Sequence, residues 1–158
     1  SQLLPYNAIS LALVFAVSTF TDVFAFFVGS IFGKHKLCEK ISPKKTVEGA
    51  IGGVAGGAIG SLLVYLLFDQ FKVFGAHFGL TYEGLGLSTF SVAATYVVIG
   101  LFGSAMTQIG DLLASMVKRY CGIKDYSRIL GEHGGIMDRF DGIMLNAVFV
   151  SFVFMFII

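Results

Sequence analysis

The sequence predicts an all-α integral membrane protein, a polytopic bundle of about four transmembrane helices with two basic cytoplasmic loops. Of its 158 residues, 56% are hydrophobic and 13% are charged, and the mean hydropathy is +0.83. A soluble domain carries about a quarter charged residues. Four apolar segments approach or reach the ~20 residues that a helix needs to cross a membrane. The basic residues gather in two of the three polar segments between them.

The four apolar segments run over residues 3–32, 51–68, 90–113 and 143–158, and we treat 1–158 as a single membrane domain. The first segment lacks the basic start and the small-residue cleavage site of a secretory signal peptide. The last segment has 16 residues. At about 1.5 Å per residue it would extend roughly 24 Å, which is short of the usual ~30 Å hydrocarbon core.

The predicted loops 33–50 and 114–142 are rich in Lys and Arg, whereas the segment between them holds only Lys72. Their basic residues are Lys34, Lys36, Lys40, Lys44, Lys45, Lys118, Arg119, Lys124, Arg128 and Arg139. Short loops with this composition stay in the cytoplasm. Both loops are therefore predicted to share the cytoplasmic face, with both ends of the chain on the other side.

Glycines recur along the second apolar segment in two i, i+4 series. The series are Gly49, Gly53, Gly57 and Gly52, Gly56, Gly60. One helix face is then nearly free of side chains, which allows helix backbones to approach closely. We favour packing inside one bundle, and a homodimer seam is the second interpretation. No phosphate-binding GxxxxGK[ST] sequence occurs.

Two carboxylates fall in or at the edge of the apolar segments, Asp22 in the first and Asp111 in the third. Such residues are normally paired, bound to metal or facing water, and each is a functional candidate. A hydrogen bond between helices, or a position near the membrane interface, is the structural alternative for Asp22.

The polar segment from 118 to 141 holds five basic and four acidic residues. Asp138 and Asp141 are three residues apart, so a helical turn would place them on one face. Such paired carboxylates suit Mg²⁺ that completes its coordination with substrate phosphates, although an isolated pair is also typical of a solvated helix turn. Asp111 and Asp125 are predicted on the same membrane face, together with many Lys and Arg residues. This setting favours a metal site over a solvated helix turn. His133 could be a general base, a phosphate ligand or a turn residue.

The sequence ISPKKTVEGAIGG at 41–53 places Lys44, Lys45 and Thr46 directly before the glycine-rich helix. Helix N-termini bind anions through free N–H groups and a partial positive charge. The segment therefore predicts a phosphate site, and a loop that binds anionic lipid headgroups is an equal alternative. His35 is given no role, and the spacing of Cys38 and Cys121 favours free thiols.

The segment from Ser115 to Asp141 resembles the signature of the phosphatidate cytidylyltransferase family, also called CDP-diacylglycerol synthases. The matching positions are Ser115, Lys118, Arg119, Lys124, Asp125, Ser127, His133, Gly134, Gly135, Asp138, Arg139 and Asp141. The first basic loop and the Gly110–Asp111 pair also match. Gly131 and Glu132 depart from the family's Pro-Gly. Family members are longer, so we expect a C-terminal part of a longer protein.

The resemblance implies transfer of the cytidylyl group from CTP to phosphatidic acid, which yields CDP-diacylglycerol and pyrophosphate. It implies Mg²⁺, alone or with a second cation, at Asp111, Asp138 and Asp141. Ser42, Lys44, Lys45, Thr46 and Ser115 are expected to bind substrate. Phosphate is expected at Lys118, Arg119, Lys124 and Arg139, with Asp125 orienting one of these bases and His133 among the catalytic candidates.

The expected partners are CTP, phosphatidic acid and membrane lipid, with no nucleic acid and with a homodimer left open. The expected location is a bacterial inner membrane, with the active site on its cytoplasmic face. Two other classes compete. One is a non-enzymatic ion-coupled transporter or anionic-lipid-binding membrane protein. The other is a CDP-alcohol phosphotransferase, which expects DGxxAR where this chain has DGIMLN.

Overall fold

The computed structural model describes residues 4–39, 41–71, 89–123 and 137–157, apart from the side chains of 4–7, 137–141 and 157. These residues form four long helices, α1 (Leu4–Phe32), α2 (Val47–Tyr65), α3 (Thr89–Tyr120) and α4 (Met137–Ile157). A π-helical turn, η1 (Leu66–Gln70), continues α2, and two strands, β1 (Lys36–Cys38) and β2 (Ser42–Thr46), lie between α1 and α2. The all-α membrane bundle predicted from the sequence is confirmed, with a short hairpin added.

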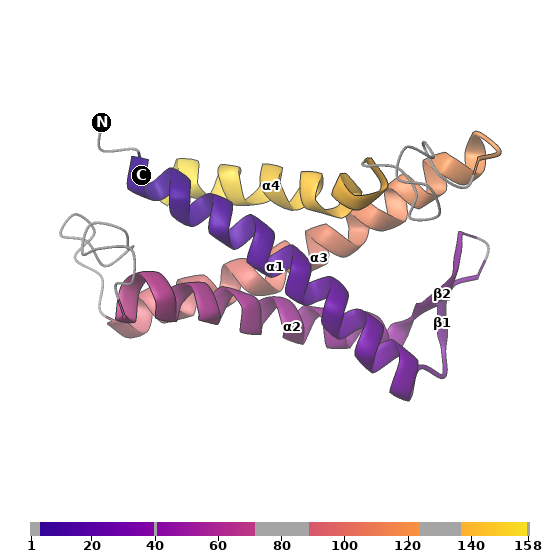
Figure 1. Cartoon of the computed structure of the whole chain (residues 1–158), viewed down its shortest axis with the longest axis horizontal. Coiled ribbons are helices and arrows are strands. Elements are labelled where there is room, and N and C mark those ends of the chain that lie inside the picture. The colour runs from indigo at the N-terminus through magenta and orange to yellow at the C-terminus, as the bar shows by residue number, and fades with distance from the viewer. Residues whose placement is uncertain (1–3, 40, 72–88, 124–136, 158) are drawn as a thin grey trace.

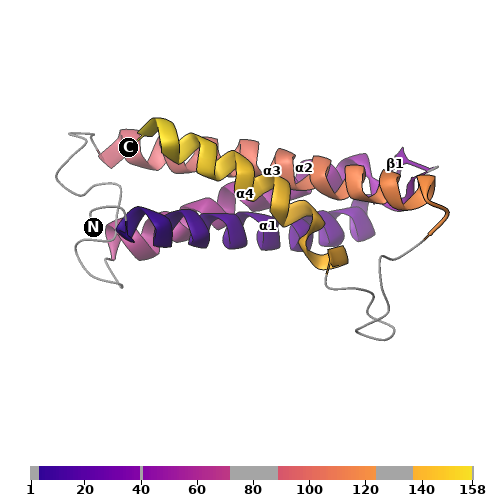
Figure 2. The same cartoon turned by 90° about the horizontal axis from the view of Figure 1, so that it is seen from above.

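The helices run along the long axis of the molecule and alternate in direction (Figures 1 and 2). The hairpin and the end of α3 lie at one end of the bundle, and the start of α1 and the end of α4 lie at the other. Among the described residues, three stretches are long and apolar enough to cross a membrane, namely Ala8–Phe32, Val47–Gln70 and Thr89–Tyr120. The apolar part of α4, Gly142–Phe156, is shorter.

Three helix ends differ from the predicted boundaries. Helix α2 begins at Val47 instead of residue 51, and α3 continues to Tyr120 instead of ending at residue 113. Helix α4 begins at Met137, six residues before the predicted start at 143. Apolar length sets where a helix must lie in the membrane, but a helix can continue into the polar region through residues such as Lys and Arg, which favour helix. Parts of both predicted loops are therefore helical.

The glycine face of α2 packs inside the bundle against α1 and α3. A Cβ atom on Gly52 would lie 2.5 Å from the Cβ of Val28 on α1. One on Gly57 would lie 2.5 Å from the Cβ of Ser104 on α3. Contacts this short leave no room for a side chain. The prediction of close packing within one bundle is confirmed.

Buried polar side chains connect α4 to α1 and α3. The Nδ2 of Asn146, which is fully buried, donates to the backbone oxygen of Val14 at 3.2 Å and to the Oγ of Ser18 at 2.9 Å. The Ser18 and Thr107 hydroxyl oxygens are 3.2 Å apart. In an apolar surrounding such groups must satisfy one another, so this set of contacts favours one register of α4 against its neighbours.

Candidate functional site

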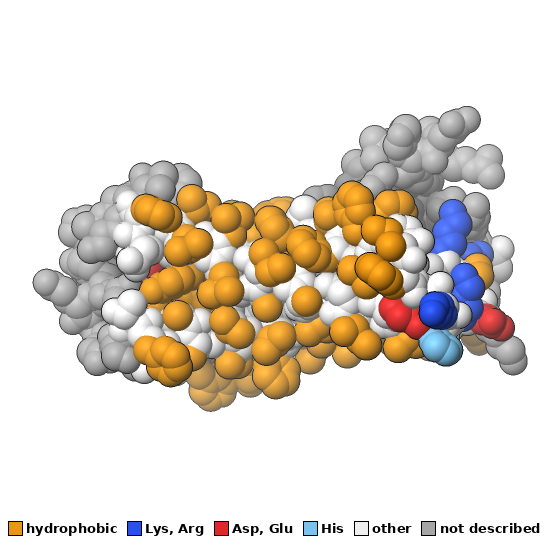
Figure 3. Space-filling view, turned by 90° about the horizontal axis from the view of Figure 1, so that it is seen from below, with side chains coloured by type: hydrophobic (Ala, Val, Ile, Leu, Met, Phe, Trp, Pro, Cys, Tyr) orange, Lys and Arg blue, Asp and Glu red, His pale blue; other side chains and the backbone are white. Residues whose placement is uncertain are grey.

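A pocket of about 360 Å³ opens at the hairpin end of the bundle, between α1, β2, α2 and α3. Its charged lining consists of Asp22 on α1, Lys44 and Lys45 on β2, and Asp111 on α3. The space-filling view shows Lys, Arg, Asp, Glu and His side chains gathered at this end, while hydrophobic side chains predominate along the middle of the face in view (Figure 3). The pocket therefore joins charged groups of both signs at the polar end of the membrane bundle.

Lys45 and Asp111 form an ion pair across this pocket, between the Nζ of the lysine and the Oδ2 of the carboxylate. The side chains are 27% and 35% exposed, so both are partly withdrawn from water. An opposite charge at contact distance offsets the cost of removing each group from solvent. Without another ligand present, the two predicted site residues neutralise each other.

Thr46 lies directly before α2 and lines the pocket. Its backbone is extended, and its Oγ1 accepts a hydrogen bond from the Gly49 N–H at 3.1 Å, which makes it the N-cap of the helix. Threonine is a favoured residue at this position because its oxygen satisfies an N–H that the helix leaves free. Thr46, Gly49 and Ala50 all line the pocket, so the N-terminus of α2 opens into it.

Three of the predicted residues lie along one side of α3. Asp111, Ser115 and Lys118 are spaced four and three residues apart on a continuous helix, which places them on a common face. Lys118 is buried, and Ser115 is partly buried. Arg119 points differently, because its Nε donates to the backbone oxygen of Ile41 in the hairpin turn at 3.4 Å. The sequence prediction placed Ser115, Lys118 and Arg119 in a loop, whereas helix α3 gives them defined directions.

The start of α4 lies against the same part of α3. A Cβ atom on Gly142 would lie 2.9 Å from the backbone oxygen of Thr107 and 3.7 Å from the Cβ of Asp111. The helical turn that contains Asp138 and Asp141 ends directly before this contact. The backbone of that turn thus ends beside Asp111, although the side chains of Asp138, Arg139 and Asp141 lie outside the described residues.

The remaining predicted site residues divide into two groups. Ser42 lies on β2, where it pairs with Cys38, and it is not among the residues that line the pocket. The others lie outside the described residues: Lys124, Asp125 and His133. The structure therefore brings together Lys44, Lys45 and Thr46 from the first polar segment and Asp111 from the third apolar segment.

Gln108 is a pocket residue that the sequence analysis missed. Its Nε2 donates to the backbone oxygen of Ala50 at 3.1 Å, which ties α3 to the first turns of α2. The sequence feature that could have identified Gln108 is its position three residues before Asp111, on the same helix face. Asp22, whose role the sequence left open, also lines the pocket.

The described residues offer oxygen ligands for a metal ion, but no complete site of protein ligands. Among them, no group of three or more His, Cys, Asp or Glu side chains could hold a metal. Asp22 and Asp111 both reach the pocket. Magnesium is usually held by one or two carboxylates together with waters and substrate phosphates, so this donor set is suited to Mg²⁺ that arrives with a phosphate ligand.

The fold and the pocket define a class of protein, an all-α membrane helix bundle with a pocket of lysines and carboxylates at its polar end. Comparison with known families is more specific. The chain belongs to the cytidylyltransferase family, whose model matches residues 2–157.

Named relatives agree with this family. The chain is 39% identical over 126 residues to a phosphatidate cytidylyltransferase of Aquifex aeolicus, covering 80% of the chain and 39% of the relative. It is 38% identical over 130 residues to one of Staphylococcus epidermidis, covering 82% and 43%. It is 38% identical over 143 residues to one of Brucella abortus, covering 90% and 46%. The chain spans less than half the length of these relatives.

Proposed function

We propose that this chain carries the nucleotide-transfer site of a phosphatidate cytidylyltransferase. A phosphate oxygen of phosphatidic acid attacks the α-phosphorus of CTP, a new phosphorus–oxygen bond forms, and the bond to the β-phosphate breaks. The products are CDP-diacylglycerol and pyrophosphate. Family membership and the names of the relatives support this reaction.

The observation that carries the proposal is the meeting of Lys45 and Asp111 in one pocket. Both substrates are anionic, so their approach requires cations placed where the phosphates will lie. Lys44 and Lys45 provide them beside the N-terminus of α2, where the helix dipole adds to the positive potential. We assign the triphosphate of CTP to this side of the pocket.

Magnesium is the proposed cofactor, and a second cation is a further expectation. Asp111 would hold it together with Asp138 and Asp141, whose helical turn ends beside Asp111. When bound, the ion would neutralise charge on the phosphates and orient them. In this proposal the protein presents carboxylates on α3 and α4 opposite lysines on β2. Once a metal ion binds Asp111, Lys45 is released from the ion pair and can bind a phosphate.

We also propose that the pocket faces the cytoplasm from a bacterial inner membrane. The hairpin and the end of α3, which hold most of the described basic residues, lie at the same end of the bundle, and basic segments stay in the cytoplasm. A homodimer stays a prediction. Since the glycine face of α2 is covered within one chain, a second copy would have to pack on another surface.

The test uses purified protein in mixed micelles that contain phosphatidic acid and Mg²⁺, with CTP that carries label in its cytidine. The expected result is label in the lipid phase and release of pyrophosphate in equal amount. Omission of phosphatidic acid is the control. Ion flux across proteoliposomes without lipid labelling would support a transporter instead. Release of labelled CMP from a cytidine-labelled CDP-alcohol, without lipid labelling from CTP, would support a phosphotransferase.

A further inference from the structure

Glu48, in the first turn of α2, holds the base of the lysine-bearing hairpin. Its Oε2 accepts the backbone N–H groups of Lys34 and His35, each at 3.2 Å, and its Oε1 lies 2.6 Å from the Nδ1 of His35. The Val47 N–H donates to the His35 backbone oxygen at 3.0 Å. One helical turn therefore binds the chain as it leaves α1, through side chain and backbone together.

The junction around these contacts has no spare room. A Cβ atom on Gly33 would lie 2.2 Å from the backbone oxygen of Gly29 and 2.7 Å from the Cγ2 of Thr46. One on Gly49 would lie 2.7 Å from the backbone oxygen of Ala25. Because interiors packed this closely do not deform freely, the angle between β2 and the start of α2 is well defined at Thr46.

Beyond this base, few contacts hold the two strands of the hairpin to the rest of the protein. Its two strands contain three and five residues and are mostly exposed or partly buried. Among the described residues, α3 holds the hairpin through the Arg119 bond to Ile41 and the Lys45–Asp111 ion pair. A two-stranded hairpin is marginally stable by itself in water. Its position over the pocket thus depends on its anchors, and Glu48 is the anchor with the most contacts.

We propose that Glu48 and His35 are positioning residues, which hold the hairpin so that Lys44 and Lys45 face the pocket. This rests on the proposed function, because it assigns the pocket's lysines to the triphosphate of CTP. Neither Glu48 nor His35 lines the pocket, so both act through the lysines.

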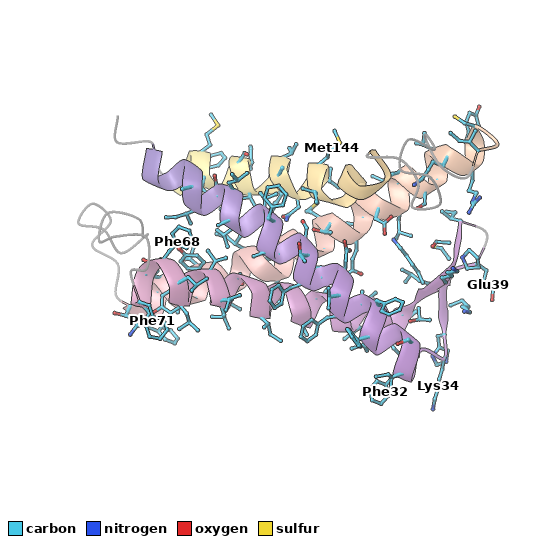
Figure 4. The ribbon with its side chains drawn as sticks, in the orientation of Figure 1. Phe32, Lys34, Glu39, Phe68, Phe71 and Met144 are labelled. Carbon is cyan, nitrogen blue, oxygen red and sulfur yellow. The ribbon has the colours of Figure 1, made fainter. Side chains whose placement is uncertain are left out.

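The first experiment compares Glu48→Ala with Glu39→Ala in the same protein. Glu39 is an exposed acid on the same hairpin and lies on its outer side (Figure 4). We expect Glu48→Ala to raise KM for CTP about tenfold and to change kcat less, because lost positioning weakens binding of the triphosphate. Glu39→Ala should leave both constants near those of the wild type. Glu48→Gln keeps an oxygen that can accept the two backbone N–H groups and should recover part of the loss.

A second measurement follows the hairpin without using activity. Cys38 lies on β1 and is partly buried, and Cys121 is exposed and is removed as Cys121→Ser. We expect Glu48→Ala to increase the rate at which a maleimide labels Cys38 roughly tenfold, since loss of the anchor increases opening of the hairpin. In the Lys45→Met background, Glu48→Ala should add little further loss of CTP affinity, because the two residues act on the same contact.

The outcomes separate this inference from the proposed function. If the wild type makes no CDP-diacylglycerol, the proposed function fails, while Cys38 labelling still tests the anchor. If Glu48→Ala behaves like Glu39→Ala in both labelling and KM, the positioning role is wrong. Should Glu48→Ala not fold, His35→Ala takes its place, because the His35 side chain is 78% exposed and its removal leaves no cavity. It should raise KM for CTP and Cys38 labelling in the same direction, and no change in either overturns the proposal.

Discussion

Lys45 on β2 and Asp111 on α3 are joined by an ion pair, although they lie 66 positions apart in the chain (111 less 45). The pair connects the first basic segment to the third predicted apolar segment, close to where that segment meets the second basic one. It also sets a condition on ligand binding. Under the proposed function, a cation at Asp111 and a phosphate at Lys45 would each replace one half of the pair, so binding of either would favour binding of the other.

Lys45→Met is expected to lower kcat/KM for CTP by about a hundredfold, because it removes a cation aimed at the triphosphate while keeping much of the side chain's length. Lys36→Met is the matched control, since Lys36 is an exposed lysine on the partner strand of the same hairpin. Initial rates of lipid labelling measure both. Equal losses in the two variants would show that overall charge matters and not the position of Lys45.

Asp111→Asn should raise the Mg²⁺ concentration needed for half-maximal activity by at least about tenfold, because the amide keeps the size of the carboxylate but loses its charge. Chelation of divalent ions should abolish activity in the wild type, and added Mg²⁺ should restore it. The measurement is an Mg²⁺ titration of the initial rate at fixed CTP. An unchanged titration in Asp111→Asn would remove Asp111 from the metal site.

Gly57→Ala is expected to destabilise the bundle by about 1–3 kcal/mol, because the added methyl group would have to displace packed atoms of α3. The atoms in its way include the Cβ of Ser104 and the backbone oxygen of Gly100. Ala55→Val adds bulk to an exposed position of the same helix and should change stability little. Thermal unfolding in detergent, followed by size-exclusion chromatography, compares the two. Similar midpoints would contradict the assigned packing.

Tyr96→Phe tests a contact at the end of the bundle opposite the hairpin. The Tyr96 hydroxyl donates to the Oδ2 of Asp69 at 2.6 Å, and both residues are buried. Loss of this bond should cost about 1–3 kcal/mol of stability. Tyr120→Phe is the control, because Tyr120 is 94% exposed. Since Tyr96 does not line the pocket, kcat of the folded fraction should not change, and a selective loss of kcat would show that the far end affects the site.

Cys121 can report the orientation of the protein in the membrane. It follows the end of α3 directly and is exposed, at the same end as the hairpin. If the basic segments face the cytoplasm, a membrane-impermeant maleimide should label Cys121 in inside-out vesicles and spare it in intact spheroplasts. Cys38→Ser removes the other thiol. Labelling in spheroplasts would reverse the assigned orientation.

Much of this architecture can be predicted from the sequence because it depends on local composition. Apolar length identifies the spans, and the two glycine series of α2 identify the face that packs. The pairing of Lys44 and Lys45 with a helix N-terminus also follows from local sequence, since Thr46 is a suitable cap. The positions of the helix ends were harder to predict from the sequence. Nothing in the apolar pattern indicates that α3 continues through Ser115 to Tyr120, because polar residues there form helix outside the membrane core.

The sequence alone determined that this is a helical membrane protein with glycine-mediated packing, and it identified Lys45 and Asp111 as separate candidates. Their contact was decided only by the tertiary structure, because it depends on the angle between the hairpin and α2 and on the position of α3 next to the hairpin. The anchoring contacts of Glu48 with Lys34 and His35 were decided in the same way. Periodicity reports which face of a helix is apolar, whereas the distance between two polar side chains on different elements depends on packing of the whole bundle.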